Sequence, residues 1–139
     1  MTRIQPPVMK PKMIIPMLVC RDAAAEVAFC RRAFGAVELS RRTAPDGSVV
    51  HATLKIHESL IMVHDESPHL ASRAPQPDGS SSVVTYLYGP EVDAVMERAV
   101  SAGARILLPA ADQAWGDRVG RIVDPEGHVW NVASRSMEE

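Results

Sequence analysis

The order of apolar and polar positions divides the chain into two similar halves. A short apolar run at 13–20 precedes Asp22. Apolar residues then recur at spacings of three and four, which predicts a helix over 23–34 that Gly35 ends. Strands are expected next at 37–42, 49–56 and 60–65. The first half is therefore predicted to be a β-α-β-β-β unit.

The second half repeats this order after a connector at 66–82 that is rich in Pro, Ser and Gly. A strand is expected at 83–88, followed by a helix with Pro90 in its first turn. The helix ends of the two halves, at Gly35 and Gly103, are 68 residues apart, and the same offset aligns Glu58 with Glu126. This shared spacing indicates an internal duplication.

We therefore expect an α+β fold of two paired βαβββ modules, at 13–65 and 83–134, within one domain spanning 13–134. The segments at 1–12 and 135–139 are predicted to be tails. Each helix can cover one face of its sheet. The remaining faces are expected to curl into a shared cup in which a ligand would lie.

Composition narrows the range of functions. The chain has 139 residues, 46% of them hydrophobic, and a net charge of −2, so it lacks the basic surface that nucleic-acid binding requires. The first dozen residues contain three prolines and no unbroken apolar run, so they are expected to be neither a signal peptide nor a membrane span. The two cysteines of the chain, Cys20 and Cys30, lie in apolar sequence and are expected to be reduced, which favours a cytoplasmic location.

The stretch ADQAWGDRVGRIVDPEGHVW, with AFGA after the first helix and AGA after the second, carries a resemblance. It resembles the vicinal-oxygen-chelate superfamily of glyoxalase, bleomycin-resistance and extradiol-dioxygenase proteins, in its PhnB-like branch, over residues 13–134. The resemblance implies paired βαβββ modules, a cup-shaped cavity and a homodimer.

Enzymes of this superfamily mostly hold a divalent metal with His, Gln or Glu side chains on the first and last strands of the modules. The resemblance places these positions at Ile15, Val84, Asn131 and either Met62 or Val63. Aliphatic side chains offer no lone pair, and an amide oxygen is a weak ligand. We therefore expect no metal site and no cofactor there. A divalent metal such as Zn, Ni, Mn or Fe held by other residues is the alternative.

Alternation along the strands predicts which side chains line the cup. The lining combines aliphatic and polar groups and suits a small organic molecule. The predicted ligand-binding residues on the strands are Ile15, Met17, Thr53, Met62, Val84, Tyr86 and Asn131.

His51 is the candidate catalytic acid or base, because imidazole titrates near neutral pH and the strand would hold it on the cup side. The alternative is a structural histidine that bonds to Thr53 or Tyr86. The other four histidines are expected to be solvated.

The segment QAWGDR is expected to form a loop at the mouth of the cup. Trp115 could cover a ligand while Asp117 and Arg118 bind its polar end. In the alternative, Asp117 and Arg118 form an ion pair and Trp115 fills the dimer interface. Nearby, 124–127 is predicted to be a structural turn, and Trp130 is predicted to pack against a helix.

The leading hypothesis is a protein of the sequestering or resistance type that binds a small organic molecule without the usual metal. The competing hypothesis is a lyase, isomerase or dioxygenase that uses His51 alone or a displaced metal set of His51, His64 and Glu58. A methyltransferase is disfavoured because no glycine-rich strand-to-helix turn is present. A scaffold with no ligand is the remaining alternative.

Overall fold

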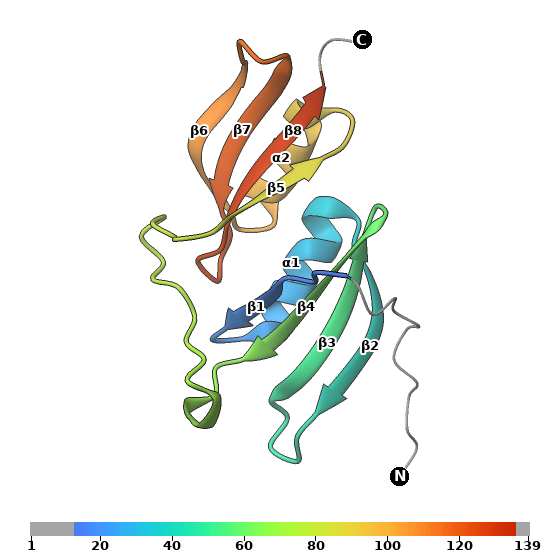
Figure 1. Ribbon diagram of the computed structural model, residues 1–139, viewed down its shortest axis with the longest axis vertical. Helices are drawn as coiled ribbons and strands as arrows, with labels where there is room; N and C mark the ends of the chain where they lie inside the picture. Colours follow the sequence, from blue (N-terminus) through green and yellow to red (C-terminus); the bar gives the residue numbers. More distant parts are fainter. Residues whose placement is uncertain (1–12, 136–139) are drawn as a thin grey trace.

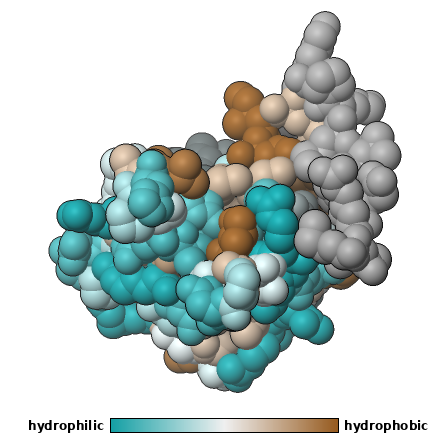
Figure 2. All heavy atoms as spheres, turned by 90° about the horizontal axis from the view of Figure 1, so that it is seen from below, coloured by the Kyte–Doolittle hydropathy of each residue, from teal (hydrophilic) through white to brown (hydrophobic). Residues whose placement is uncertain are grey.

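The computed structural model describes residues 13–135. The predicted tail at 1–12 and most of the predicted tail at 135–139 lie outside the described residues, while Arg135 ends the last strand. No helix in the described part is both long and apolar enough to cross a membrane. Figure 2 shows apolar patches interrupted by polar surface on the face that it presents.

The first module has the predicted order of elements. They are β1 (Met17–Cys20), α1 (Ala23–Phe34), β2 (Val37–Thr43), β3 (Val49–Ile56) and β4 (Ser59–Asp65). Its strands form a sheet in the order β1-β4-β3-β2, in which β1 is parallel to β4 (Figure 1). The Asp22 side chain accepts a hydrogen bond from the Ala25 amide and so caps α1, while Gly35 ends it in a left-handed conformation with φ of 70°.

The first strand is shorter than the predicted run at 13–20. Pro16 has no amide hydrogen and cannot donate to a neighbouring strand. Its carbonyl still accepts a hydrogen bond from the Met62 amide, at 2.9 Å, and regular pairing begins at Met17.

The second module repeats the first. A short 3₁₀ turn, η1 (Pro68–Leu70), lies in the connector, and the module then comprises β5 (Val84–Tyr88), α2 (Val92–Ser101), β6 (Arg105–Asp112), β7 (Asp117–Val123) and β8 (Val129–Arg135). Its sheet has the order β5-β8-β7-β6, with β5 parallel to β8. The predicted pair of βαβββ modules is thus confirmed.

The offset of 68 residues, first seen between the two helix ends, also separates the starts of equivalent strands in the two modules. Val37 and Arg105 begin the equivalent strands β2 and β6, and Val49 and Asp117 begin β3 and β7. Spacing is therefore preserved through most of both modules.

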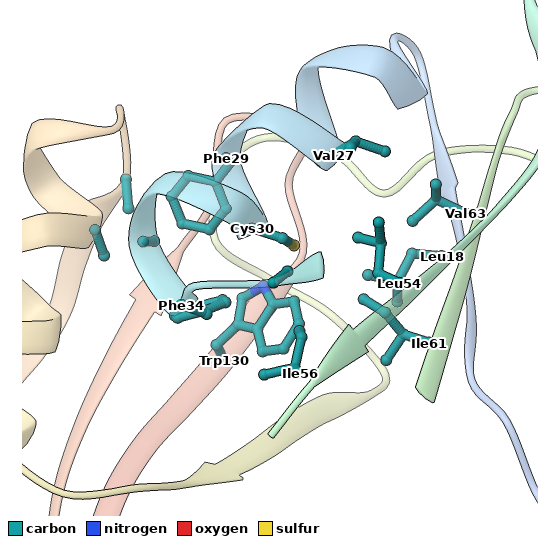
Figure 3. Packing of buried hydrophobic residues seen from close by; sticks show 14 of the residues in the cluster. Leu18, Val27, Phe29, Cys30, Phe34, Leu54, Ile56, Ile61, Val63 and Trp130 are labelled. Atoms are coloured by element: carbon teal, nitrogen blue, oxygen red, sulfur yellow. The ribbon is translucent and has the colours of Figure 1, made fainter. Parts of the chain in front are cut away.

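The two modules meet through their helices and a shared core. In the described chain, every close approach between strands lies within one sheet, whereas α1 packs against α2. Trp130 from β8 is 1% exposed and lies against Phe34 at the end of α1, with ring centroids 4.7 Å apart (Figure 3). Its indole nitrogen donates to Asp124 Oδ2 at 2.9 Å. Trp130 therefore packs against a helix, as predicted, although the helix belongs to the other module.

The last turn of each module reaches the strand-to-helix junction of the other. Glu126, in the turn between β7 and β8, accepts a hydrogen bond from the Asp22 amide at 2.7 Å. His57, in the turn between β3 and β4, lies so close to Gly89 that an added Cβ there would be 2.9 Å from its Nε2 atom. These reciprocal contacts fix how the modules are oriented.

Replacing Trp130 with Phe should destabilise the protein by about 1–3 kcal/mol, because Asp124 loses a buried hydrogen-bond donor. Urea denaturation would measure the loss. The control is Leu70→Ala, since Leu70 is 71% exposed and its loss should cost less than about 0.5 kcal/mol. Equal stability losses in the two variants would contradict the role given to Trp130.

Candidate functional site

Each sheet has one face against a helix and one open face. In β3, the side chains of Ala52, Leu54 and Ile56 are buried on the helix side. Strand alternation places His51 and Thr53 on the other side, as predicted. The open faces carry most of the predicted ligand-binding residues.

Three predicted residues of the first sheet lie side by side on its open face. Met62 in β4 pairs with Met17 on one side and with Thr53 on the other. His51 bonds to Thr53, with 3.1 Å between Nε2 and Oγ1, which is the contact that its structural alternative predicted. Thr53 is fully buried, so this contact satisfies a buried hydroxyl, and the Thr53 side chain is covered on this face.

The pKa of His51 is lowered. Partial burial is the largest cause, and electrostatic interactions with Arg42 and His64 add to it. His51 is therefore neutral at pH 7 and can accept a proton. His64 is also buried, and its Nδ1 atom contacts the Asp65 carbonyl at 2.7 Å, so the prediction of a solvated His64 is wrong.

The open face of the second sheet carries an ordered pair of tyrosines. Tyr86 and Tyr88 donate their hydroxyls to Asp117 Oδ2 at 2.8 and 2.5 Å, and their ring centroids are 5.1 Å apart. The rings are 40% and 46% exposed, whereas Asp117 is fully buried. Arg135 approaches the other oxygen of Asp117 at 2.9 Å. Asp117 thus orients two exposed aromatic rings.

The pKa values of Asp117 and Tyr86 are both shifted in the direction that favours these hydrogen bonds. The Tyr88 hydroxyl is the largest of the causes that hold the pKa of Asp117 below its ordinary value. Burial is the largest cause of the raised pKa of Tyr86, and the Asp117 charge adds to it. At neutral pH the carboxylate is therefore charged and the Tyr86 hydroxyl keeps its proton.

The alternative ion pair between Asp117 and Arg118 is not formed. Arg118 instead contacts both carboxylate oxygens of Asp93 in α2 at 3.0 Å, and it also reaches Asp112. Successive residues of a strand point to opposite faces, so Arg118 projects to the helix side when Asp117 projects to the open face. Arg118 therefore lies apart from the other predicted residues.

Arg121 is a residue of the open face that the sequence reasoning missed. Its Nε atom donates to Asn131 Oδ1 at 2.7 Å, and Asn131 pairs with Tyr86 across β8 and β5. Strand alternation could have identified Arg121, because it follows Asp117 by four residues in the same strand and therefore lies on the same face. The amide oxygen of Asn131, at the position of the family glutamate, is thus already bonded.

A cavity of about 880 Å³ lies between the edge strands β1 and β5. Met17 and Val84, two predicted ligand-binding residues, both line it, whereas Ile15 does not. Part of the connector, including Arg73, Gln76 and 80–82, forms one wall. The cavity therefore joins the starts of the two open faces.

The displaced metal set proposed from sequence is not brought together. His64 is close enough to His51 to affect its pKa, but Glu58 lies in the exposed turn between β3 and β4. Among the described residues, the group with metal-binding geometry is Cys20, Glu26 and His128.

This second group lies in the junction between the modules. Cys20 Sγ is 3.8 Å from His128 Nε2 and 4.0 Å from a Glu26 oxygen, and Cys30 Sγ is 3.4 Å from the other Glu26 oxygen. Burial, followed by the charge of Asp124, raises the pKa of Glu26 well above its ordinary value. Burial likewise raises the pKa of the Cys20 thiol. The cysteines are thus buried but have polar neighbours, and His128 is not the solvated group predicted.

Comparison with known proteins identifies a family. The family model described as Glyoxalase/Bleomycin resistance protein/Dioxygenase superfamily matches residues 12–132. An uncharacterised protein of Mycobacterium bovis, Mb0911c, is 41% identical over 126 residues, covering 88% of this chain and 83% of the relative. Protein Rv0887c of Mycobacterium tuberculosis is also 41% identical, and the match covers 88% of this chain and 74% of that protein.

Solved structures share the fold over most of the chain. TioX from Micromonospora is 26% identical and covers 88% of this chain and 97% of its own, with a TM-score of 0.68. The Arabidopsis thaliana gene product At5g48480 is also 26% identical, with coverage of 88% and 98% and a TM-score of 0.71. The fosfomycin resistance protein FosX from Listeria monocytogenes, at 18% identity, coverage of 89% and 93% and a TM-score of 0.65, shows the fold alone.

Replacing Asp117 with Asn should lower the pKa of Tyr86, because the nearby negative charge is removed. The chain contains two tyrosines, Tyr86 and Tyr88, so the ultraviolet absorbance of tyrosinate during an alkaline titration reports on this site alone. Asp46→Asn, at an exposed turn, is the matched control and should leave the titration unchanged. An unaltered curve for the Asp117 variant would contradict the proposed contact.

Proposed function

The chain belongs to the glyoxalase/bleomycin resistance protein/dioxygenase superfamily, and we propose that it binds a small organic molecule without the family's usual metal. The binding surface is the cavity between β1 and β5 together with the adjoining open faces. Sequestration, as in a resistance protein of the PhnB-like branch, is the role that this site supports best. The free, buried Cys20 and Cys30 support a reducing compartment such as the cytoplasm.

The observation that carries this proposal is the lining of the cavity. Met17 and Val84 present hydrocarbon from both edge strands, and the volume of about 880 Å³ is within the usual range for small-molecule sites. Next to Met17 is Met62, and beyond Val84 along β5 is Tyr86. These side chains favour an apolar or aromatic body over a hydrated ion.

Polar groups on the second open face suit one end of such a ligand. Asn131, Arg121 and the paired tyrosine hydroxyls are held by hydrogen bonds before any ligand arrives. Preorganised groups of this kind lower the cost of binding. Trp115 is exposed in the turn before Asp117 and would cover a ligand that extends this far.

A homodimer is part of the proposal. Met17, Tyr86 and Tyr88 remain 40–46% exposed in the single chain, which is unusual for large side chains on a sheet face. A second copy laid over these faces would complete the cup and exclude water from the ligand.

A catalytic role for His51 is the alternative, favoured by one observation. Its lowered pKa leaves the ring neutral at pH 7, as a general base requires, and it lies on the open face. In that case the protein would be a lyase, isomerase or dioxygenase acting by proton transfer or with a metal held elsewhere.

Replacing Val84 with Trp should fill part of the cavity and weaken binding of the fluorescent probe anilinonaphthalene sulfonate roughly tenfold, because steric overlap costs about 1–3 kcal/mol. Fluorescence titration would give the two dissociation constants. Val100→Trp, on the exposed side of α2, is the matched control and should bind like the unmodified protein. Equal affinity in both variants would place the probe, and the proposed site, elsewhere.

His51→Ala separates the two functions. If the protein only binds, the variant should keep its fold and its affinity for anilinonaphthalene sulfonate within about threefold. If the protein is an enzyme, a screen of glyoxalase, isomerase and dioxygenase substrates should detect turnover that this variant loses. Metal binding that depends on Met62, Val84 or Asn131 would contradict the leading proposal.

A further inference from the structure

A buried cluster at the junction of the modules combines three side-chain types that bind transition metals. Cys20 ends β1, Glu26 lies in the first turn of α1, and His128 immediately precedes β8. Each offers one ligand atom, and these atoms lie within 4.8 Å of one another. We propose that this cluster binds a zinc ion. The inference does not rest on the proposed function.

The separations between the ligand atoms suit a tetrahedral zinc site. Bonds of about 2.3 Å to sulfur and about 2.0 Å to nitrogen or oxygen place neighbouring ligand atoms roughly 3.5 Å apart. Cys20 Sγ is 3.8 Å from His128 Nε2 and 4.0 Å from Glu26 Oε1. Contraction by a few tenths of an ångström would therefore bring these atoms to bonding distance.

Cys30 is a neighbour of this group and not one of its three ligands. Its sulfur is 3.4 Å from Glu26 Oε2, on the side of the carboxyl away from the Cys20 contact. Figure 3 shows Cys30 on α1 directed toward the buried side chains beneath the helix. One thiolate, one imidazole and one carboxylate form a set that zinc prefers and that magnesium and calcium do not. A water molecule would take the fourth position of the tetrahedron.

The charge of the junction also favours a cation. The carboxyls of Glu26, Asp124 and Glu126 are all buried there. The contacts found for them among residues 13–135 come from backbone amides, the Trp130 indole, thiols and a hydrogen bond between Glu26 and Asp124 themselves, and none comes from Lys or Arg. A divalent ion would supply the positive charge that this group of carboxyls lacks.

The structure already orients the histidine that would bind. Asp124 accepts a hydrogen bond from the His128 amide at 2.9 Å, which anchors the turn. His128 Nε2 now donates to the Val19 carbonyl at 2.8 Å and would exchange that single bond for the metal. Because Cys20 and Glu26 come from one module and His128 from the other, the ion would link the modules.

The test uses the full chain, freed of metal with a chelator and titrated with Zn²⁺. Competition with a chromogenic chelator should show one ion bound per chain, and thermal unfolding should shift to a higher temperature. Cys20→Ser and His128→Gln should each weaken binding by at least roughly tenfold. His51→Ala and His69→Gln are matched controls, since neither residue belongs to the cluster, and both should bind like the unmodified chain.

Co²⁺ in the unmodified chain provides a second measurement in case the variants do not fold. Coordination by Cys20 should produce a thiolate-to-cobalt charge-transfer band in the near ultraviolet. Absence of that band, absence of Zn²⁺ binding, or binding that depends on His51 rather than on His128 would each overturn the proposal.

Discussion

The contact between Trp130 and Phe34, fastened by Asp124, is the interaction on which the arrangement of this molecule depends. Each module has one sheet and one helix, and the described strands approach one another closely only within a sheet. The pair is therefore held where α1 packs against α2 and where Trp130 of β8 meets Phe34 of α1. Asp124 binds the Trp130 indole and the amides of Glu126 and His128. One carboxylate thus sets both the core contact and the turn that carries the junction.

The same junction determines where a ligand can lie. Because the β7–β8 turn is held near the end of β1, the edges of β1 and β5 stay far enough apart to leave a cavity, which the connector then walls on one side. The open faces lead away from this cavity and carry the ordered polar groups around Asp117 and Arg121. The packing at the junction therefore also determines where the cavity forms.

Local patterns predicted the parts of this structure that depend on neighbouring residues. Apolar spacing gave the elements, and strand alternation placed Met17, Thr53, Tyr86 and Asn131 on open faces. Contacts across the fold could not be read in this way. The partners of His128 are more than 100 residues away in β1, and Arg118 was assigned to the cup because its loop was not recognised as the start of β7. The connector also gave no periodic signal that it would line a cavity.

The reciprocal reach of the two turns has an evolutionary consequence. Glu126 contacts the start of α1, and His57 contacts the equivalent place beside Gly89 before α2. Such an exchange of matching contacts is what two identical subunits make around a two-fold axis. A half-length ancestor could have formed this interface between separate chains, and gene fusion would then have left each half free to diverge: one toward an aliphatic wall, the other toward aromatic and guanidinium groups.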